Sequence, residues 1–327
     1  MEHQLQYAPD RQADRVPSQE HSSKQLLERL VIGWSSRAEV RRGTVHDQYH
    51  FDETRPDFLT ENLPFHNHPR FKQLSEGEKA LVLSYGWLIY CEKTIDIENR
   101  IVTPLCIDII DGRVPYFRDE VSKKLACETM IDESYHVLLT IHANGITRKQ
   151  RNITAQLQPS LLLQRVHSCL NSHPLEWQQW LIRFVACCVS EIFISDYLLL
   201  IADSEVVQPL HQQVTQAHRR DELAHGAIFR RLARNLYPQL TLEEQEFFQY
   251  LLPKSVSWFA EPDFPQWRRV FTQLGLADMD TLLAESQHGA AIHDAIDYSG
   301  IVELAHELGI THNSLTQQSF RNEGLAL

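Results

Sequence analysis

The sequence predicts an all-α fold built around a four-helix bundle. Five proline-free stretches are rich in helix-forming residues, with apolar side chains three and four positions apart, whereas the alternation typical of strands is scarce. Within these stretches the motif Asp-Glu-x-x-His occurs twice, at residues 132–136 and 221–225. Two Glu-x-x-His elements on separate helices, each beside a further buried Glu, are how a four-helix bundle holds two metal ions. The sequence therefore indicates a dinuclear metal enzyme.

Prolines and turn residues set the order of the predicted helices. Ser75-Glu-Gly-Glu78 matches a capping box and should start the first long helix. Asp111-Gly112 marks the turn after it. Residues 145–174 are expected to form a long connection that crosses over the bundle and starts a second helical hairpin. The stretches predicted to be largely helical are 70–103, 116–158, 175–208, 210–237 and 239–252.

No linker divides the chain, so we expect a single helical domain over residues 23–312. Residues 1–22 and 313–327 are predicted to be mobile tails. The aromatic residues beyond the bundle are expected to cap it or to line a substrate pocket. They are Trp258, Phe259, Phe264 and Trp267.

Composition excludes several classes of partner. The net charge of −12 argues against nucleic acid or an anionic membrane. We find no apolar run of about 18 residues, so no membrane-spanning helix is expected. The N-terminus lacks the apolar core of a signal peptide, and the six cysteines show no Cys-x-x-Cys spacing. These features indicate reduced thiols in a cytoplasmic protein.

Glu-x-x-His alone is weak support for a metal site, because the chain has 17 histidines. The spacing also occurs in Glu285-Ser-Gln-His288 and in Glu303-Leu-Ala-His306. Neither of these copies has an upstream Glu at a matching distance along a neighbouring helix. We therefore expect Glu285 and Glu303 to be structural or exposed.

Helix lengths single out the other two copies. Glu191 shares an apolar stripe with Phe184 and Leu198, so its side chain should point inward. About 12 residues lead from it to Asp203, and about 13 lead back to Glu222 after the turn. The two legs are nearly equal, which places Glu191 and Glu222 level on antiparallel helices.

The same comparison of helix lengths applies to the first hairpin. Glu98 shares an apolar stripe with Val102; about 13 residues lead from it to Asp111, and about 15 return to Glu133. Glu92 is an alternative first ligand on the same helix, rotated by about 120°. We prefer Glu98 because its stripe and its distance from the turn both fit.

His218 precedes Glu222 by one turn and adds a third imidazole, which could bind one ion or be an ordinary core or surface histidine. Carboxylates and imidazoles without a thiolate suit iron or manganese better than a structural zinc site. Asp132 and Asp221 each lie one turn before a ligand histidine and could accept a ring N–H from one, although solvated helix positions are the alternative. The predicted ligands and catalytic residues are Glu98, Glu133, His136, Glu191, His218, Glu222 and His225.

With these residues the chain resembles the AurF-like di-iron N-oxygenases, the family of p-aminobenzoate N-oxygenase. The likeness rests on Glu98 within Glu-Lys-Thr-Ile-Asp-Ile-Glu98-Asn-Arg-Ile-Val, on Glu133, His136 and Glu191, and on His218-x-x-x-Glu222-x-x-His225. The third histidine separates this family from plain ferritin-like sites. The resemblance implies a ferritin-like bundle, two iron ions and dioxygen. It also implies oxidation of an amine to a hydroxylamine, and on to nitroso or nitro products, in secondary metabolism.

The sequence leaves the substrate and the partners less narrowly defined than the metal ligands. No Gly-x-Gly-x-x-Gly is present, so electrons should come from an external donor such as a reductase. An aryl amine, an amino-acid-derived amine and an amine tethered to a carrier protein all stay open, and a homodimer is a guess. Tyr90, Lys93 and Tyr197 are candidate pocket residues, with plain packing as the alternative. Competing functions are a di-iron C–H hydroxylase or oxidase and a non-enzymatic iron-binding bundle.

Overall fold

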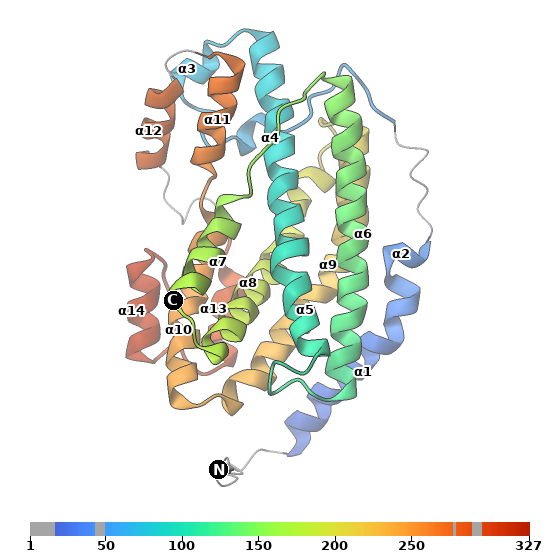
Figure 1. The fold of residues 1–327 in the computed structure, drawn as a ribbon, viewed down its shortest axis with the longest axis vertical. Coiled ribbons are helices and arrows are strands. Elements are labelled where there is room, and N and C mark those ends of the chain that lie inside the picture. The colour runs from blue at the N-terminus through green and yellow to red at the C-terminus, as the bar shows by residue number, and fades with distance from the viewer. Residues whose placement is uncertain (1–16, 43–49, 277–278, 290–295) are drawn as a thin grey trace, which may run out of the picture.

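The structure is a computed structural model that describes residues 17–42, 50–276, 279–289 and 296–327. Over these residues every regular element is a helix, as predicted (Figure 1). The elements are α1 (Pro17–Arg37), α2 (Glu39–Arg42), η2 (Thr60–Asn62), α3 (Pro69–Lys72), α4 (Glu76–Ile97), η3 (Glu98–Val102), α5 (Thr103–Ile110), α6 (Glu120–Gln150), α7 (Leu161–Ser172), α8 (Glu176–Ala202), α9 (Pro209–Leu236), η4 (Tyr237–Gln239), α10 (Leu242–Ala260), α11 (Phe264–Leu274), α12 (Met279–Gly289), α13 (Ser299–Glu307) and α14 (Ser314–Asn322).

Four long rods form the bundle. The first is α4, η3 and α5 in one line, and it packs against α6, whereas α8 packs against α9 (Figure 1). The expected capping box starts the first rod: the Ser75 backbone N–H donates to Glu78 Oε2 over 2.8 Å, and the Glu78 N–H donates to Ser75 Oγ over 3.3 Å. Gly112, with a φ of 73°, takes the turn after α5. The predicted order of the two hairpins is therefore confirmed.

The crossover between the hairpins contains more helix than the sequence indicated. Residues 145–150 still belong to α6, because Gly145 lies on an exposed face where a helix tolerates it. Asn152, with a φ of 53°, follows the end of α6. Ser160 then caps α7, which fills residues 161–172 of the predicted connection.

A wide turn lets the first rod pass Pro104. Residues 98–102 form a π-helix in which the Thr103 N–H donates to the Glu98 carbonyl, five residues back. Pro104 then stands at the second position of α5, where the missing N–H costs little. The rod continues to Ile110, as the helix-length argument required, and the π turn lies directly at Glu98.

Both predicted tails need correction. Residues 17–22 belong to α1, and residues 1–16 lie outside the described residues. At the other end, residues 314–322 form α14, which packs against α10. Phe320 and Leu325 are buried there, and Thr316 Oγ1 donates to Gln249 Oε1 over 2.8 Å. The short amphipathic segment buries enough apolar surface to be held in place.

Helix α8 is more apolar than the sequence analysis allowed. Among the described residues it alone is long and apolar enough to cross a membrane by length and composition, with a mean hydropathy of 2.0. In the structure, 67% of that apolar window is buried, because α8 packs against α7, α9 and α10.

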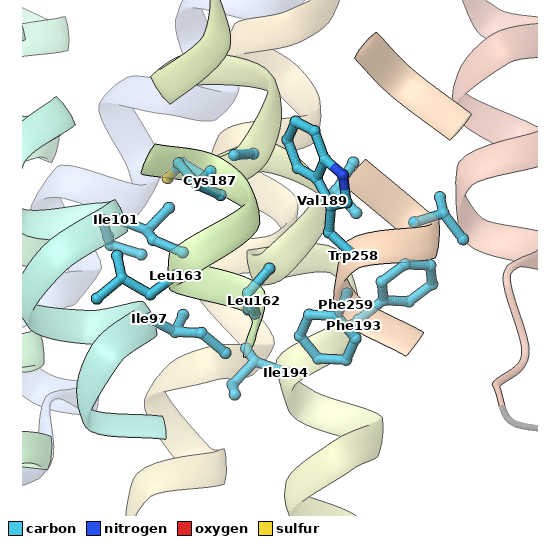
Figure 2. Packing of buried hydrophobic residues seen from close by; sticks show 14 of the residues in the cluster. Ile97, Ile101, Leu162, Leu163, Cys187, Val189, Phe193, Ile194, Trp258 and Phe259 are labelled. Carbon is cyan, nitrogen blue, oxygen red and sulfur yellow. The ribbon is translucent and has the colours of Figure 1, made fainter. Parts of the chain in front are cut away.

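The core continues on the outer side of α8. Figure 2 shows Ile97 and Ile101 of the first rod, Leu162 and Leu163 of α7, and Phe193 of α8 within one apolar cluster. On α10, Phe259 packs on Phe193 with ring centroids 5.2 Å apart. Trp258, Phe264 and Trp267 are also buried. These aromatic residues therefore belong to the core beside α8, and Trp258 and Phe264 also line a pocket with Tyr250 and Lys254.

Gly226 sets the distance between α8 and α9. A Cβ at this position would lie 2.9 Å from the Glu191 carbonyl oxygen, which belongs to the helix backbone and cannot turn away. Close approach of two backbones is one of the uses of glycine inside a helix. Gly226 thus draws together the helices that carry Glu191 and His225.

We expect Gly226→Ala to push α8 and α9 apart and to lower the free energy of unfolding by about 1–3 kcal/mol, the usual effect of overpacking. The matched control is Gly145→Ala on α6, where a Cβ meets nothing within 4 Å. That variant should instead gain about 0.5–1 kcal/mol from helix propensity. Urea unfolding of the two variants measures both effects, and equal stabilities would contradict the proposed contact.

Candidate metal centre

All seven predicted ligands converge at the middle of the bundle. Glu98 comes from η3, Glu133 and His136 from α6, Glu191 from α8, and the other three from α9. Each residue is buried, with at most 1% of its surface exposed. The residues that α9 supplies are His218, Glu222 and His225.

The ligand atoms form two groups, and in each group all of them lie within 4.8 Å of one another. Glu133 and Glu222 belong to both groups. The first group adds Glu98, His136 and His218, and the second adds Glu191 and His225. Two adjacent cation sites that share two carboxylates are the arrangement expected of a dinuclear centre.

In the first group two imidazoles face the shared carboxylates. His218 Nε2 lies 3.2 Å from Glu98 Oε1 and 3.0 Å from Glu222 Oε1. His136 Nδ1 lies 3.1 Å from Glu222 Oε1 and 3.0 Å from Glu133 Oε2. The two rings stack, with centroids 4.0 Å apart.

In the second group, His225 Nδ1 is the central nitrogen. It lies 3.0 Å from Glu133 Oε1, 3.3 Å from Glu222 Oε2 and 3.6 Å from Glu191 Oε2. Glu133 and Glu222 therefore turn one oxygen toward each group, as bridging carboxylates do.

Many of these buried atoms have no hydrogen-bond partner. They include both carboxylate oxygens of Glu98 and of Glu191, one oxygen each of Glu133 and Glu222, and Nδ1 of His225. An unpaired buried polar atom is costly, and most such atoms in proteins are bonded. These atoms all face one small volume, so cations placed there would satisfy them together.

The electrostatics support the same conclusion. Burial, and then repulsion from neighbouring carboxylates, raise the pKa of Glu133 and of Glu191 well above the usual range. Burial opposes charge on Glu222 as well, but the His225, His136 and His218 imidazoles hold its pKa well below that range. Four carboxylates this close together can all ionise only if positive charge compensates them, and two divalent cations would supply that charge.

Asp132 and Asp221 hold the outer nitrogens of the ligand histidines, and they do so crosswise. His136 Nε2 donates to Asp221 Oδ2 over 3.1 Å, and His225 Nε2 donates to Asp132 Oδ2 over 3.3 Å. Each Asp therefore serves the histidine of the opposite helix. These contacts orient each ring so that Nδ1 faces the carboxylate cluster. The expectation that these two residues accept a ring N–H is confirmed.

The N-terminal helices reach the centre from outside, which the sequence analysis missed. Trp34 Nε1 on α1 donates to both oxygens of Asp132, over 3.0 and 2.9 Å. The backbone N–H of Glu39 on α2 contacts both oxygens of Asp221 at 3.2 Å. The Trp34 side chain would have been the only sequence signal, since a backbone donor leaves none.

The rejected candidates lie elsewhere. Glu92 is half-buried and belongs to neither group. Glu285 is 63% exposed and accepts from His68 Nε2 over 2.8 Å. Glu303 is 65% exposed and pairs with Arg230 over 3.0 Å. The reading of Glu285 and Glu303 as structural or exposed is confirmed.

Tyr90, Lys93 and Tyr197 form one layer, in which Tyr90 is buried and the other two residues are half-buried. The Tyr90 and Tyr197 rings stack, with centroids 4.4 Å apart. Lys93 Nζ donates to the Phe259 carbonyl over 2.6 Å and lies over the rings of Tyr197 and Phe259. Burial lowers the pKa of Lys93 to about 7, although Asp263 opposes the shift. In this structure the three residues pack against one another.

A sequence model of the family described as P-aminobenzoate N-oxygenase AurF matches residues 20–309. The chain belongs to this family. Among characterised proteins it is similar to a 4-aminobenzoate N-oxygenase of Streptomyces thioluteus, with 28% identity over 289 residues that cover 87% of this chain and 86% of that protein. The resemblance inferred from the ligand residues is confirmed. This AurF-family protein is an oxygenase, an enzyme that takes a small-molecule substrate and dioxygen.

Loss of a shared carboxylate and loss of an unshared one should lower the metal content of the protein by different amounts. Glu222→Ala should abolish binding of both metal ions, because Glu222 belongs to both groups, whereas Glu191→Ala should leave about one of two ions per chain. Mass-spectrometric metal analysis of protein purified without chelators measures the content. Glu303→Ala, at a rejected Glu-x-x-His copy, is the control and should keep both ions. A Glu222→Ala protein with a full metal content would refute the assignment.

The buried amine of Lys93 predicts a pH effect on stability. Its pKa is about 7 in the folded protein and 10.5 when unperturbed, so between these values the unfolded chain binds the extra proton. The free energy of unfolding should therefore rise with pH in this window, by on the order of 1 kcal/mol per pH unit.

Lys93→Met should remove this slope, whereas Lys124→Met, at an exposed position, should keep it. Urea unfolding at several pH values from neutral to alkaline makes the comparison. Identical slopes in Lys93→Met and the unchanged protein would show that Lys93 stays charged.

Proposed function

We propose that this AurF-family protein is a di-iron, dioxygen-dependent N-oxygenase that oxidises an amine to a hydroxylamine, or further to a nitroso or nitro product. The observation that carries the proposal is the pair of overlapping ligand groups that share Glu133 and Glu222. Membership of the family and the similarity to a 4-aminobenzoate N-oxygenase support the same reaction.

The donor set favours iron, with manganese as the second choice. It consists of carboxylate oxygens and imidazole nitrogens, with no thiolate in either ligand group. When bound, two ferrous ions would supply two electrons to dioxygen. The balanced reaction consumes an amine, dioxygen, two electrons and two protons and yields a hydroxylamine and water, so an external donor such as a reductase must return the two electrons.

The protein side chains have separate tasks in this reaction. Glu133 and Glu222 would hold the ions together, and Asp132 and Asp221 fix the orientation of the partner histidines by accepting from Nε2. The apolar residues around the centre exclude water, which strengthens every electrostatic interaction inside. The layer of Tyr90, Lys93 and Tyr197 is the proposed wall of the amine pocket.

The relative supports an aryl amine as the substrate class, within secondary metabolism. Amino-acid-derived and carrier-tethered amines are the further candidates that the test includes. We propose that the enzyme is cytoplasmic and a homodimer, with neither nucleic acid nor membrane among its partners, in keeping with its net charge of −12.

The test uses protein reconstituted with Fe²⁺, a chemical reductant, isotope-labelled dioxygen and a panel of the three amine classes, with 4-aminobenzoate as the first aryl amine. We expect mass spectrometry to detect an N-oxygenated product that carries the label, and to detect none with Glu222→Ala. A labelled hydroxyl group on carbon, with the amine intact, would contradict the proposal and favour a C–H hydroxylase.

A further inference from the structure

The N-terminal segment lies outside the four rods yet contacts both Asp residues behind the metal centre. Helix α1 packs against α6 and α9, and α2 packs against the same two helices. The N-terminal segment contacts the two Asp residues through different kinds of donor. Asp132 receives a side-chain donor, the Trp34 indole, whereas Asp221 receives a backbone donor, the N–H of Glu39.

A chain of hydrogen bonds leads from Trp34 through Asp132 to the imidazole of His225, a predicted metal ligand. The indole N–H lies 2.9 Å from Asp132 Oδ2, and the same oxygen lies 3.3 Å from His225 Nε2. Asp132 and His225 are fully buried, and Trp34 is half-buried at the outer end. Trp34 therefore connects the outside of the bundle to the second ligand group.

An indole N–H can donate but never accept. It therefore holds the Asp132 carboxylate in one orientation. Asp132 in turn accepts from Nε2 of His225, so that Nδ1 faces Glu133, Glu191 and Glu222. On the opposite side, Asp221 needs no particular side chain, since any residue at position 39 except proline supplies a backbone N–H.

We propose that Trp34 is a positioning residue of the metal centre, which acts through Asp132 to orient His225 and strengthens binding of the ion held by the second ligand group. The inference rests on the proposed metal centre and adds to it a contribution from outside the bundle. It predicts that the two ions respond differently to changes in α1.

The test is a titration of the metal-free full-length chain with Co²⁺ against a competing chelator. Substitution of a partner behind a ligand commonly costs about 10–100-fold in metal affinity. We expect Trp34→Phe to lower the affinity for one of the two ions by about that factor, and to change the visible spectrum of that ion, while the other ion binds within about twofold of normal. The matched control is Trp177→Phe, a half-buried tryptophan on α8 that packs on Phe247.

A double-mutant cycle separates positioning from simple packing. Asp132→Asn should weaken the same ion, and adding Trp34→Phe to it should cause little further loss, because both changes interrupt one chain of hydrogen bonds. Fully additive losses would overturn the proposal. Asp132→Asn alone also tests the predicted ion if Trp34→Phe does not fold.

The outcomes distinguish this inference from the metal centre itself. An unchanged protein that binds no Co²⁺ would overturn the proposed centre. Two ions bound with equal affinity by the unchanged protein and by Trp34→Phe would overturn only the role of Trp34. Weakening of both ions by the same factor would also contradict it, because Trp34 reaches one ligand group.

Discussion

Repulsion among four buried carboxylates is the constraint on which the rest of the structure depends. Glu98, Glu133, Glu191 and Glu222 lie in one dry volume, where like charges repel strongly and water cannot solvate them. Compensating cations at this point would make the arrangement favourable. The cluster therefore lowers the stability of the fold unless cations are bound. The burial of the surrounding apolar side chains offsets this loss.

Two local departures from regular helix packing place the carboxylates. The π turn at residues 98–102 rotates the first rod at the point where Glu98 must face inward, and it also accommodates Pro104. Gly226 lets α9 approach the backbone of Glu191. A π turn inside a helix occurs frequently at functional sites.

The ligand set could be predicted from the sequence because it depends on local periodicity. Equal helix lengths on both sides of two turns placed Glu98 level with Glu133 and Glu191 level with Glu222. The contact of Trp34 with Asp132 could not be predicted in this way, since the two residues are 98 positions apart and no helical repeat relates them. Helix α14 was missed for a related reason: a short amphipathic segment becomes stable only through the surface that receives it.

The crosswise pairing of the Asp and His residues fixes how α6 and α9 lie along each other. Each helix offers one acceptor and one donor to the other, so a slide in either direction would break both bonds at once. A slip by one helical turn, about 5.4 Å, would also leave four buried groups facing the wrong neighbours. The doubled motif therefore fixes the axial register of α6 and α9, because only one alignment of the two helices satisfies both hydrogen bonds.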